Sequence, residues 1–89
     1  MPLTMMKPQF VEVIPRDLRE GILYVSTRYN TAIHLCACGC GIEVVTPLGP
    51  TQWKMTNQEG VVSLSPSIGS YQIPCKSHYW IRDNGIHWC

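Results

Sequence analysis

Three of the chain's five cysteines stand within five residues of one another, at Cys36, Cys38 and Cys40. The chain has 89 residues, and a domain of this length buries too little of its surface for the core alone to give much stability. Short cysteine-rich chains are therefore usually stabilised by disulfides or by a metal ion. We expect one small domain over residues 1–89, with residues 1–9 extended or flexible.

A metal ion explains the cysteine cluster better than disulfides do. The cysteine count is odd, and the first residues contain no apolar stretch of signal-peptide length, which predicts a cytoplasmic protein with reduced thiols. Gly39 and Gly41 allow the tight backbone turns of a zinc knuckle. Cys36, Cys38 and Cys40 would supply three ligands and Cys75 the fourth, forming a structural zinc site.

Other uses of these thiols stay open at this point. The spacing of Cys75 and His78 also suits zinc, so a site with three cysteines and His78 is an alternative. Zinc is the preferred interpretation, but four cysteines would also hold a [2Fe–2S] cluster. The remaining alternative is that the thiols are buried and bind no metal. Cys89 is expected to have no role. A zinc site closed by four thiolates performs no chemistry, so any activity is expected elsewhere.

Turn residues divide the remaining sequence into short β-rich segments, which predicts an all-β fold: a zinc-stabilised meander of short antiparallel strands and hairpins. Residues 16–20 are a polar connection with at most one helical turn. Residues 65–70 contain too much Ser, Pro and Gly for an element, and Asn84-Gly85 predicts a hairpin. Strands are expected at residues 10–14, 22–26, 31–35, 42–46, 51–56, 61–64, 71–73, 79–82 and 86–88.

Composition narrows the classes of partner. Charged residues make up 15% of the chain and the net charge is +1, which does not fit a nucleic-acid binder. No run of about 18 apolar residues is present to span a membrane. The low charge and the aromatic side chains fit a protein partner better.

Two segments outside the cysteine cluster carry candidate chemistry. The loop at residues 65–70 offers hydroxyls on a tight backbone whose amides could stabilise an oxyanion, although an ordinary turn fits the same composition. His78 follows a predicted zinc ligand, so the metal would fix its position near Ser67, with Asp83 or Glu43 to orient it as a general base. His34 is the competing base, two residues before the cluster.

Four motifs stand out together, at residues 34–41 (HLCACGCG), 45–48 (VTPL), 65–69 (SPSIG) and 75–81 (CKSHYWI). In combination they resemble a bacterial family called BubE, found beside ubiquitin-like conjugation genes. The resemblance covers roughly residues 20–88 and implies a zinc-containing serine peptidase that processes the C-terminus of a ubiquitin-like protein. By position it implies Ser67 as the nucleophile and His78 or His34 as the base, whereas Ala37 replaces the family's usual proline.

The main hypothesis is therefore a peptidase in which amides near Ile68 and Gly69 stabilise the oxyanion formed when Ser67 attacks. A metallopeptidase with an open zinc site is a variant of it. The alternative is a zinc-ribbon-like adaptor that binds proteins of the conjugation pathway without catalysis. A hydrogen-bond distance of about 2.6–3.2 Å between Ser67 and a histidine would favour the enzyme.

Overall fold

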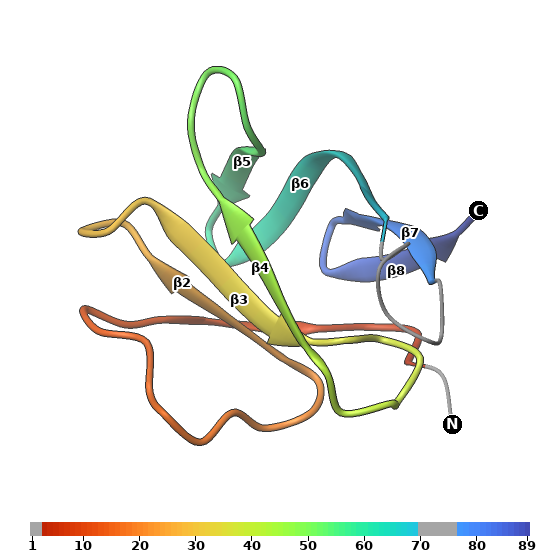
Figure 1. Cartoon of the computed structure of the whole chain (residues 1–89). Helices are drawn as coiled ribbons and strands as arrows, with labels where there is room; N and C mark the ends of the chain where they lie inside the picture. The colour runs from red at the N-terminus through yellow and green to blue at the C-terminus, as the bar shows by residue number, and fades with distance from the viewer. Residues whose placement is uncertain (1–2, 70–76) are drawn as a thin grey trace.

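A computed structural model of the chain describes residues 3–69 and 77–89, and within these ranges the fold is all-β, as predicted (Figure 1). None of the described residues forms a helix, so none of them forms one able to cross a membrane. The eight strands are β1 (Lys7–Phe10), β2 (Ile22–Ser26), β3 (Thr31–Leu35), β4 (Glu43–Pro47), β5 (Lys54–Gln58), β6 (Val61–Gly69), β7 (His78–Arg82) and β8 (Gly85–Trp88).

The first sheet has the order β1-β2-β3-β4. β2 and β3 have the predicted bounds, because branched residues alternate there and turn residues flank them. The prediction of a strand at residues 10–14 is wrong in position, since β1 ends at Phe10. β1 lies parallel to β2 at the edge of the sheet, where Pro8 is tolerated because its missing N–H is not needed by a neighbour.

The second sheet is an antiparallel meander in the order β5-β6-β7-β8. Its last hairpin is the one predicted, and Asp83 and Asn84 form the two-residue turn, both with positive φ (49° and 65°). Such a turn matches the twist of the flanking strands. Asn84 also accepts a hydrogen bond from the Val62 amide through Oδ1 (2.8 Å), which fixes the turn against β6.

The prediction of a loop at residues 65–70 is wrong for residues 65–69, which continue β6. The pairing of β6 with β7 changes register between Leu64 and Ile68, and the Ser65–Pro66 peptide bond in this segment is cis. A bulge of this kind accepts proline and extra residues without ending the strand. Ser70 and the predicted strand at residues 71–73 lie outside the described residues.

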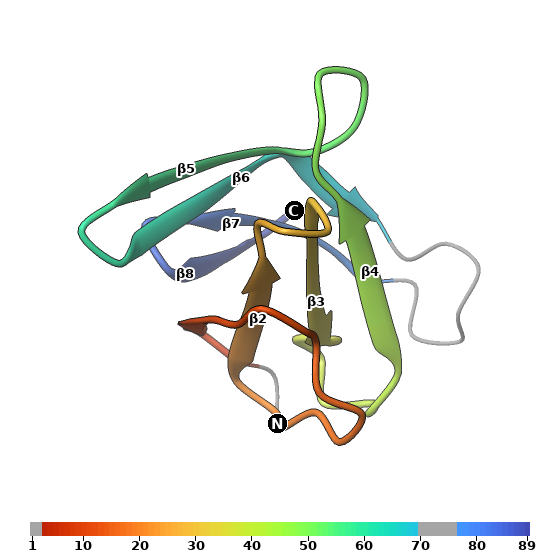
Figure 2. The ribbon, with the colours of Figure 1, turned by 90° about the vertical axis from the view of Figure 1, so that its left-hand side faces the viewer.

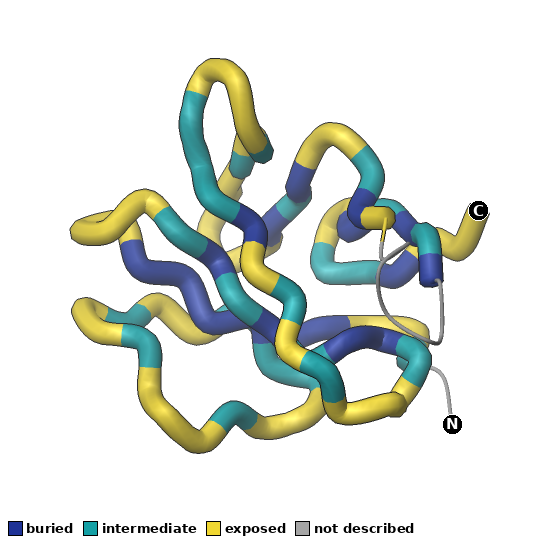
Figure 3. The backbone as a smooth tube through the Cα atoms, viewed as in Figure 1, coloured by how far each residue is buried: buried dark blue, intermediate teal, exposed yellow. Residues whose placement is uncertain are grey.

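The two sheets pack against each other, with the buried residues concentrated where they face (Figures 2 and 3). The N-terminal segment joins their edges. The Met6 amide donates to the Asn84 carbonyl and the Ile86 amide to the Thr4 carbonyl, at 2.7 and 2.8 Å, before the chain enters β1. β7 lies between β6 and β8 in the second sheet, and its residues Tyr79 and Ile81 are part of the core that the two sheets share.

Leu64 provides a test of this core. It is 1% exposed and lies on β6, while Val61 on the same strand is 41% exposed. We expect Leu64→Ala to lower the free energy of unfolding by about 2–5 kcal/mol, because it leaves a cavity between the sheets. Val61→Ala is expected to change it by about 0.5 kcal/mol or less. Urea unfolding of both variants measures the difference, and equal losses would contradict this description of the core.

Candidate active site and metal centre

The three clustered cysteines converge. The Sγ atoms of Cys36, Cys38 and Cys40 lie within 4.8 Å of one another, and those of Cys36 and Cys38 are 3.5 Å apart. Three thiolates on a tetrahedral zinc ion at about 2.3 Å would be about 3.8 Å apart, so the spacing fits such an ion. No two of the described cysteines form a disulfide. The three thiols could therefore bind a metal ion.

The backbone around the cluster is a closed loop that follows β3. The Gly39 amide donates to the Cys36 carbonyl (3.1 Å), and the Cys36 amide donates to the Ile42 carbonyl (2.8 Å). Gly39 and Gly41 have φ of 92° and 81°, a region that side chains with a Cβ rarely adopt. These glycines are what allow Cys36, Cys38 and Cys40 to turn their sulfurs toward one point.

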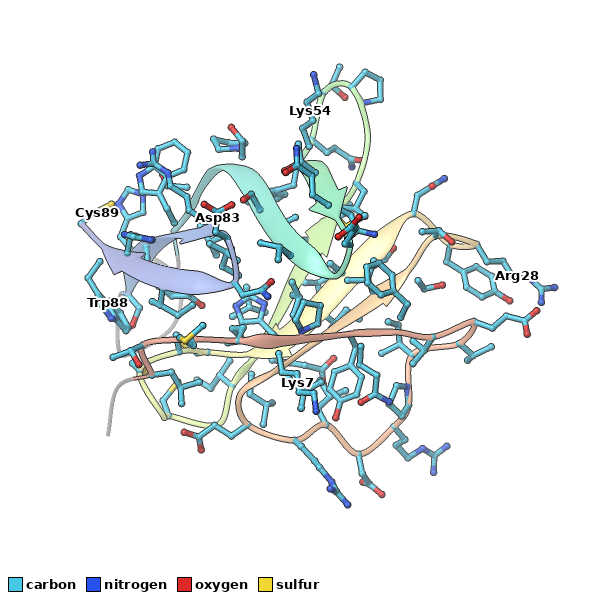
Figure 4. The ribbon with its side chains drawn as sticks, turned by 180° about the vertical axis from the view of Figure 1, so that it is seen from behind. Lys7, Arg28, Lys54, Asp83, Trp88 and Cys89 are labelled. Atoms are coloured by element: carbon cyan, nitrogen blue, oxygen red, sulfur yellow. The ribbon has the colours of Figure 1, made fainter. Side chains whose placement is uncertain are left out.

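The remaining cysteines have different positions. Cys75, the predicted fourth ligand, lies outside the described residues. Cys89 is exposed and lies at the end of the chain beyond β8 (Figure 4). Within the described residues, the group that could hold an ion is Cys36, Cys38 and Cys40, and it includes neither Cys89 nor His78.

The structure brings Ser67 and His78 together. Ser67 Oγ and His78 Nε2 are 2.7 Å apart, within hydrogen-bond range, and both side chains are half-buried. This separation is inside the range that the sequence analysis gave as favouring an enzyme over an adaptor. A serine hydroxyl bonded to an imidazole nitrogen is the arrangement in which a base can remove the hydroxyl proton.

The register shift in β6 decides how these two side chains meet. From Leu64 to Ile68 the chain advances four residues, while its partner advances only two, from Ile81 to Tyr79. Gly69 therefore lies directly opposite His78, and Ser67 is diagonal to it on the same face. Because Gly69 has no side chain, nothing at that position blocks the imidazole from reaching across to Ser67.

His34 has another partner. Its Nε2 lies 2.7 Å from the Tyr79 hydroxyl, its ring is fully buried, and its Nδ1 has no hydrogen-bond partner among the described residues. Burial lowers the pKa of His34 to about 4, so the ring is neutral at pH 7. The structure thus places His34 against Tyr79 and places His78, not His34, against Ser67.

The amides of Ile68 and Gly69 point in opposite directions. The Cys89 amide donates to the His78 carbonyl (3.0 Å), so the backbone N–H and C=O of His78 face β8. Because these groups alternate in direction from one residue of a strand to the next, those of Tyr79 face β6. Ile68 pairs with Tyr79, and its amide therefore faces β7. The amide of Gly69 faces the other edge of β6, which β5 no longer covers because its pairing ends at Ser65.

Comparison with known proteins adds one decisive match. The family described as "Bacterial ubiquitination-like system serine protease (BubE)" matches residues 10–89, which is most of the chain. The chain belongs to the BubE family. Neither the curated proteins nor the solved structures contain a protein that matches it. Membership places the chain among the serine proteases of bacterial ubiquitination-like systems and implies partners from such a system.

Neither predicted carboxylate lies beside the serine and histidine that this BubE member brings together. Asp83 is at the far end of β7 from His78, where its amide donates to Ser63 Oγ (2.8 Å). Glu43 is exposed on β4, opposite Leu35 in the first sheet. The described residues therefore do not show Asp83 or Glu43 orienting His78.

Tyr79 also belongs to this site, and the sequence analysis gave it no role there. Its hydroxyl contacts His34 Nε2 and accepts a hydrogen bond from the Ala37 amide (3.4 Å), inside the cysteine loop. Burial raises the pKa of Tyr79 well above its usual range, so the hydroxyl keeps its proton. The strand predicted at residues 79–82 contained no local signal for these partners.

Proposed function

We propose that this BubE member is a zinc-containing serine peptidase that cleaves a ubiquitin-like protein precursor at its C-terminal end. The observation that carries the proposal is the 2.7 Å contact between Ser67 Oγ and His78 Nε2 in a chain whose family is described as a serine protease. In the proposed reaction His78 Nε2 takes the hydroxyl proton as Ser67 Oγ attacks the scissile carbonyl carbon.

The reaction then proceeds in two stages. The tetrahedral intermediate collapses, His78 gives the proton to the leaving amine, and the shortened substrate stays bound to Ser67 as an ester. His78 then takes a proton from a water molecule, which attacks the ester carbonyl carbon. When the ester bond breaks, His78 gives that proton to Ser67 Oγ and the shortened substrate leaves as a carboxylate. We propose the Gly69 amide as an oxyanion donor because it faces the edge of β6 that β5 does not pair with beyond Ser65, two residues from Ser67, whereas the Ile68 amide faces β7.

The proposed zinc holds the fold together and takes no part in the cleavage. Cys36, Cys38 and Cys40 would bind it, with Cys75 as the proposed fourth ligand, and an all-thiolate set leaves no open position for a reacting water. Tyr79 connects the cysteine loop to β7 through its contact with the Ala37 amide. His34 contacts the same Tyr79 hydroxyl, so we assign the base to His78.

A serine-directed fluorophosphonate probe tests the nucleophile directly. We expect it to attach to Ser67 and to stop cleavage of a precursor ubiquitin-like protein from such a bacterial system, because the probe reacts with a serine whose proton is accepted by a base. Peptide mass spectrometry of the labelled protein identifies the modified residue. Cleavage that continues after complete labelling of Ser67 would overturn the proposal, and binding of the precursor without cleavage would favour the adaptor.

A further inference from the structure

A groove of about 370 Å³ lies on the outer face of the second sheet, and its lining includes Ser65 and Trp80, which are two residues from Ser67 and His78 along their strands. β5, β6 and β7 form its floor, and Ser63 and Ser65 contribute hydroxyls. Side chains alternate along a strand, so Trp80 and Arg82 share the face of β7 that carries His78, while Tyr79 and Ile81 lie in the core. The groove and the catalytic pair therefore open on the same face.

Two cations give this groove its charge. Arg82 stacks on Trp80, with the guanidinium carbon 4.3 Å from the ring centroid, and Lys54 lies across the groove, opposite Ser65. Within residues 3–69 and 77–89 the one ion pair is Arg28 with Glu12, so neither groove cation is neutralised there. Asp83 is an acidic group at the rim of the groove, with Oδ1 3.5 Å from Ser63 Oγ, and the two cations outnumber it.

We propose that this groove binds an acidic segment of the protein substrate next to the bond that is cleaved. Arg82, held in place by Trp80, would form a bidentate contact with one carboxylate, and Lys54 would attract a second. The serine hydroxyls between them suit the remaining lone pairs of such a carboxylate. This inference rests on the proposed peptidase function, because it concerns the substrate of the same site.

The spacing along β7 indicates where the acidic residues of the substrate lie. Trp80 is two residues from His78 and Arg82 is four, which correspond to about 7 and 13 Å along a strand. An extended substrate advances at a similar rate, so its carboxylates would stand two to four residues from the cleaved bond. Lys54 pairs with Ser65, which is two residues before Ser67, so its separation from Ser67 along the sheet is similar to that of Trp80 from His78.

The test uses the full-length, metal-loaded protein and a ubiquitin-like precursor with single substitutions two to four residues on either side of its cleavage site. We expect Glu→Gln or Asp→Asn in the substrate, Arg82→Gln and Lys54→Gln each to lower kcat/KM by about fivefold to tenfold, mainly through KM. Raising the salt from 50 to 500 mM should reduce the difference between acidic and neutral substrates.

The matched control is Lys7→Gln, which removes an exposed lysine of β1 that lies in the first sheet and well apart from Lys54 (Figure 4). This variant should cleave like the parent protein. Arg82→Glu should prefer a precursor with Lys at the same substrate positions, an exchange that a merely structural role for Arg82 would not produce. Cleavage at equal rates of acidic, neutral and basic precursors would overturn the inference, whereas no cleavage of any precursor would overturn the proposed function.

Discussion

Replacing Ser67 with alanine is expected to reduce cleavage of the ubiquitin-like precursor by about 10⁴-fold or more, while the fold and the metal content stay unchanged. The substitution removes the atom that we propose forms the bond to the substrate. Ser67 is half-buried on β6, and the hydrogen-bond partner of its hydroxyl among the described residues is His78. The expected loss is therefore in catalysis and not in stability.

The control for Ser67→Ala is Thr51→Ala, which removes an exposed hydroxyl from the loop between β4 and β5. Cleavage is followed by mass spectrometry of the precursor, and thermal unfolding and metal content are measured for both variants. Thr51→Ala should retain parental activity. A Ser67→Ala protein that remains folded and cleaves at the parental rate would show that another group attacks the substrate.

Local sequence signals were enough to predict the parts of this site that depend on neighbouring residues. The spacing of Cys36, Cys38 and Cys40, with glycines after two of them, predicted that their thiols would converge, and they do. The strands β2 and β3 were predicted with their observed bounds, because alternating branched residues end at clear turns. In each case the determining contacts lie within a few residues of the pattern.

The parts that could not be predicted depend on the register between distant strands. The Ser, Pro and Gly of residues 65–69 indicated a loop, but pairing with β7 keeps Ile68 and Gly69 in β6. That pairing places Gly69 opposite His78, and no local pattern specifies which of its residues faces the histidine. The contact of His34 with Tyr79 joins residues 45 positions apart, and only the packing of the two sheets creates it.

Replacing Cys36, a proposed metal ligand, is expected to have a large effect on the stability of the fold, as Ser67→Ala is expected to have on catalysis. Cys36 is fully buried in the core cluster and lies at the point where β3 enters the cysteine loop. A structural zinc ion contributes roughly 10–16 kcal/mol of apparent binding free energy, whereas small domains have a net stability of about 5–15 kcal/mol. Cys36→Ser should therefore lose zinc and fail to fold at 25 °C, and a strong chelator should unfold the parent protein.

Cys89→Ser provides the matched control, because Cys89 is exposed and outside the cysteine group. It should bind one zinc ion per chain and unfold at the parental temperature, as measured by metal analysis and circular dichroism. The chelated parent protein should regain its β spectrum when zinc is added back, which separates loss of the ion from irreversible damage. A chelated protein that is free of metal and still unfolds cooperatively at the parental temperature would show that the two sheets are stable without the ion. Stability would then have to come from the core around Leu64 and Ile81.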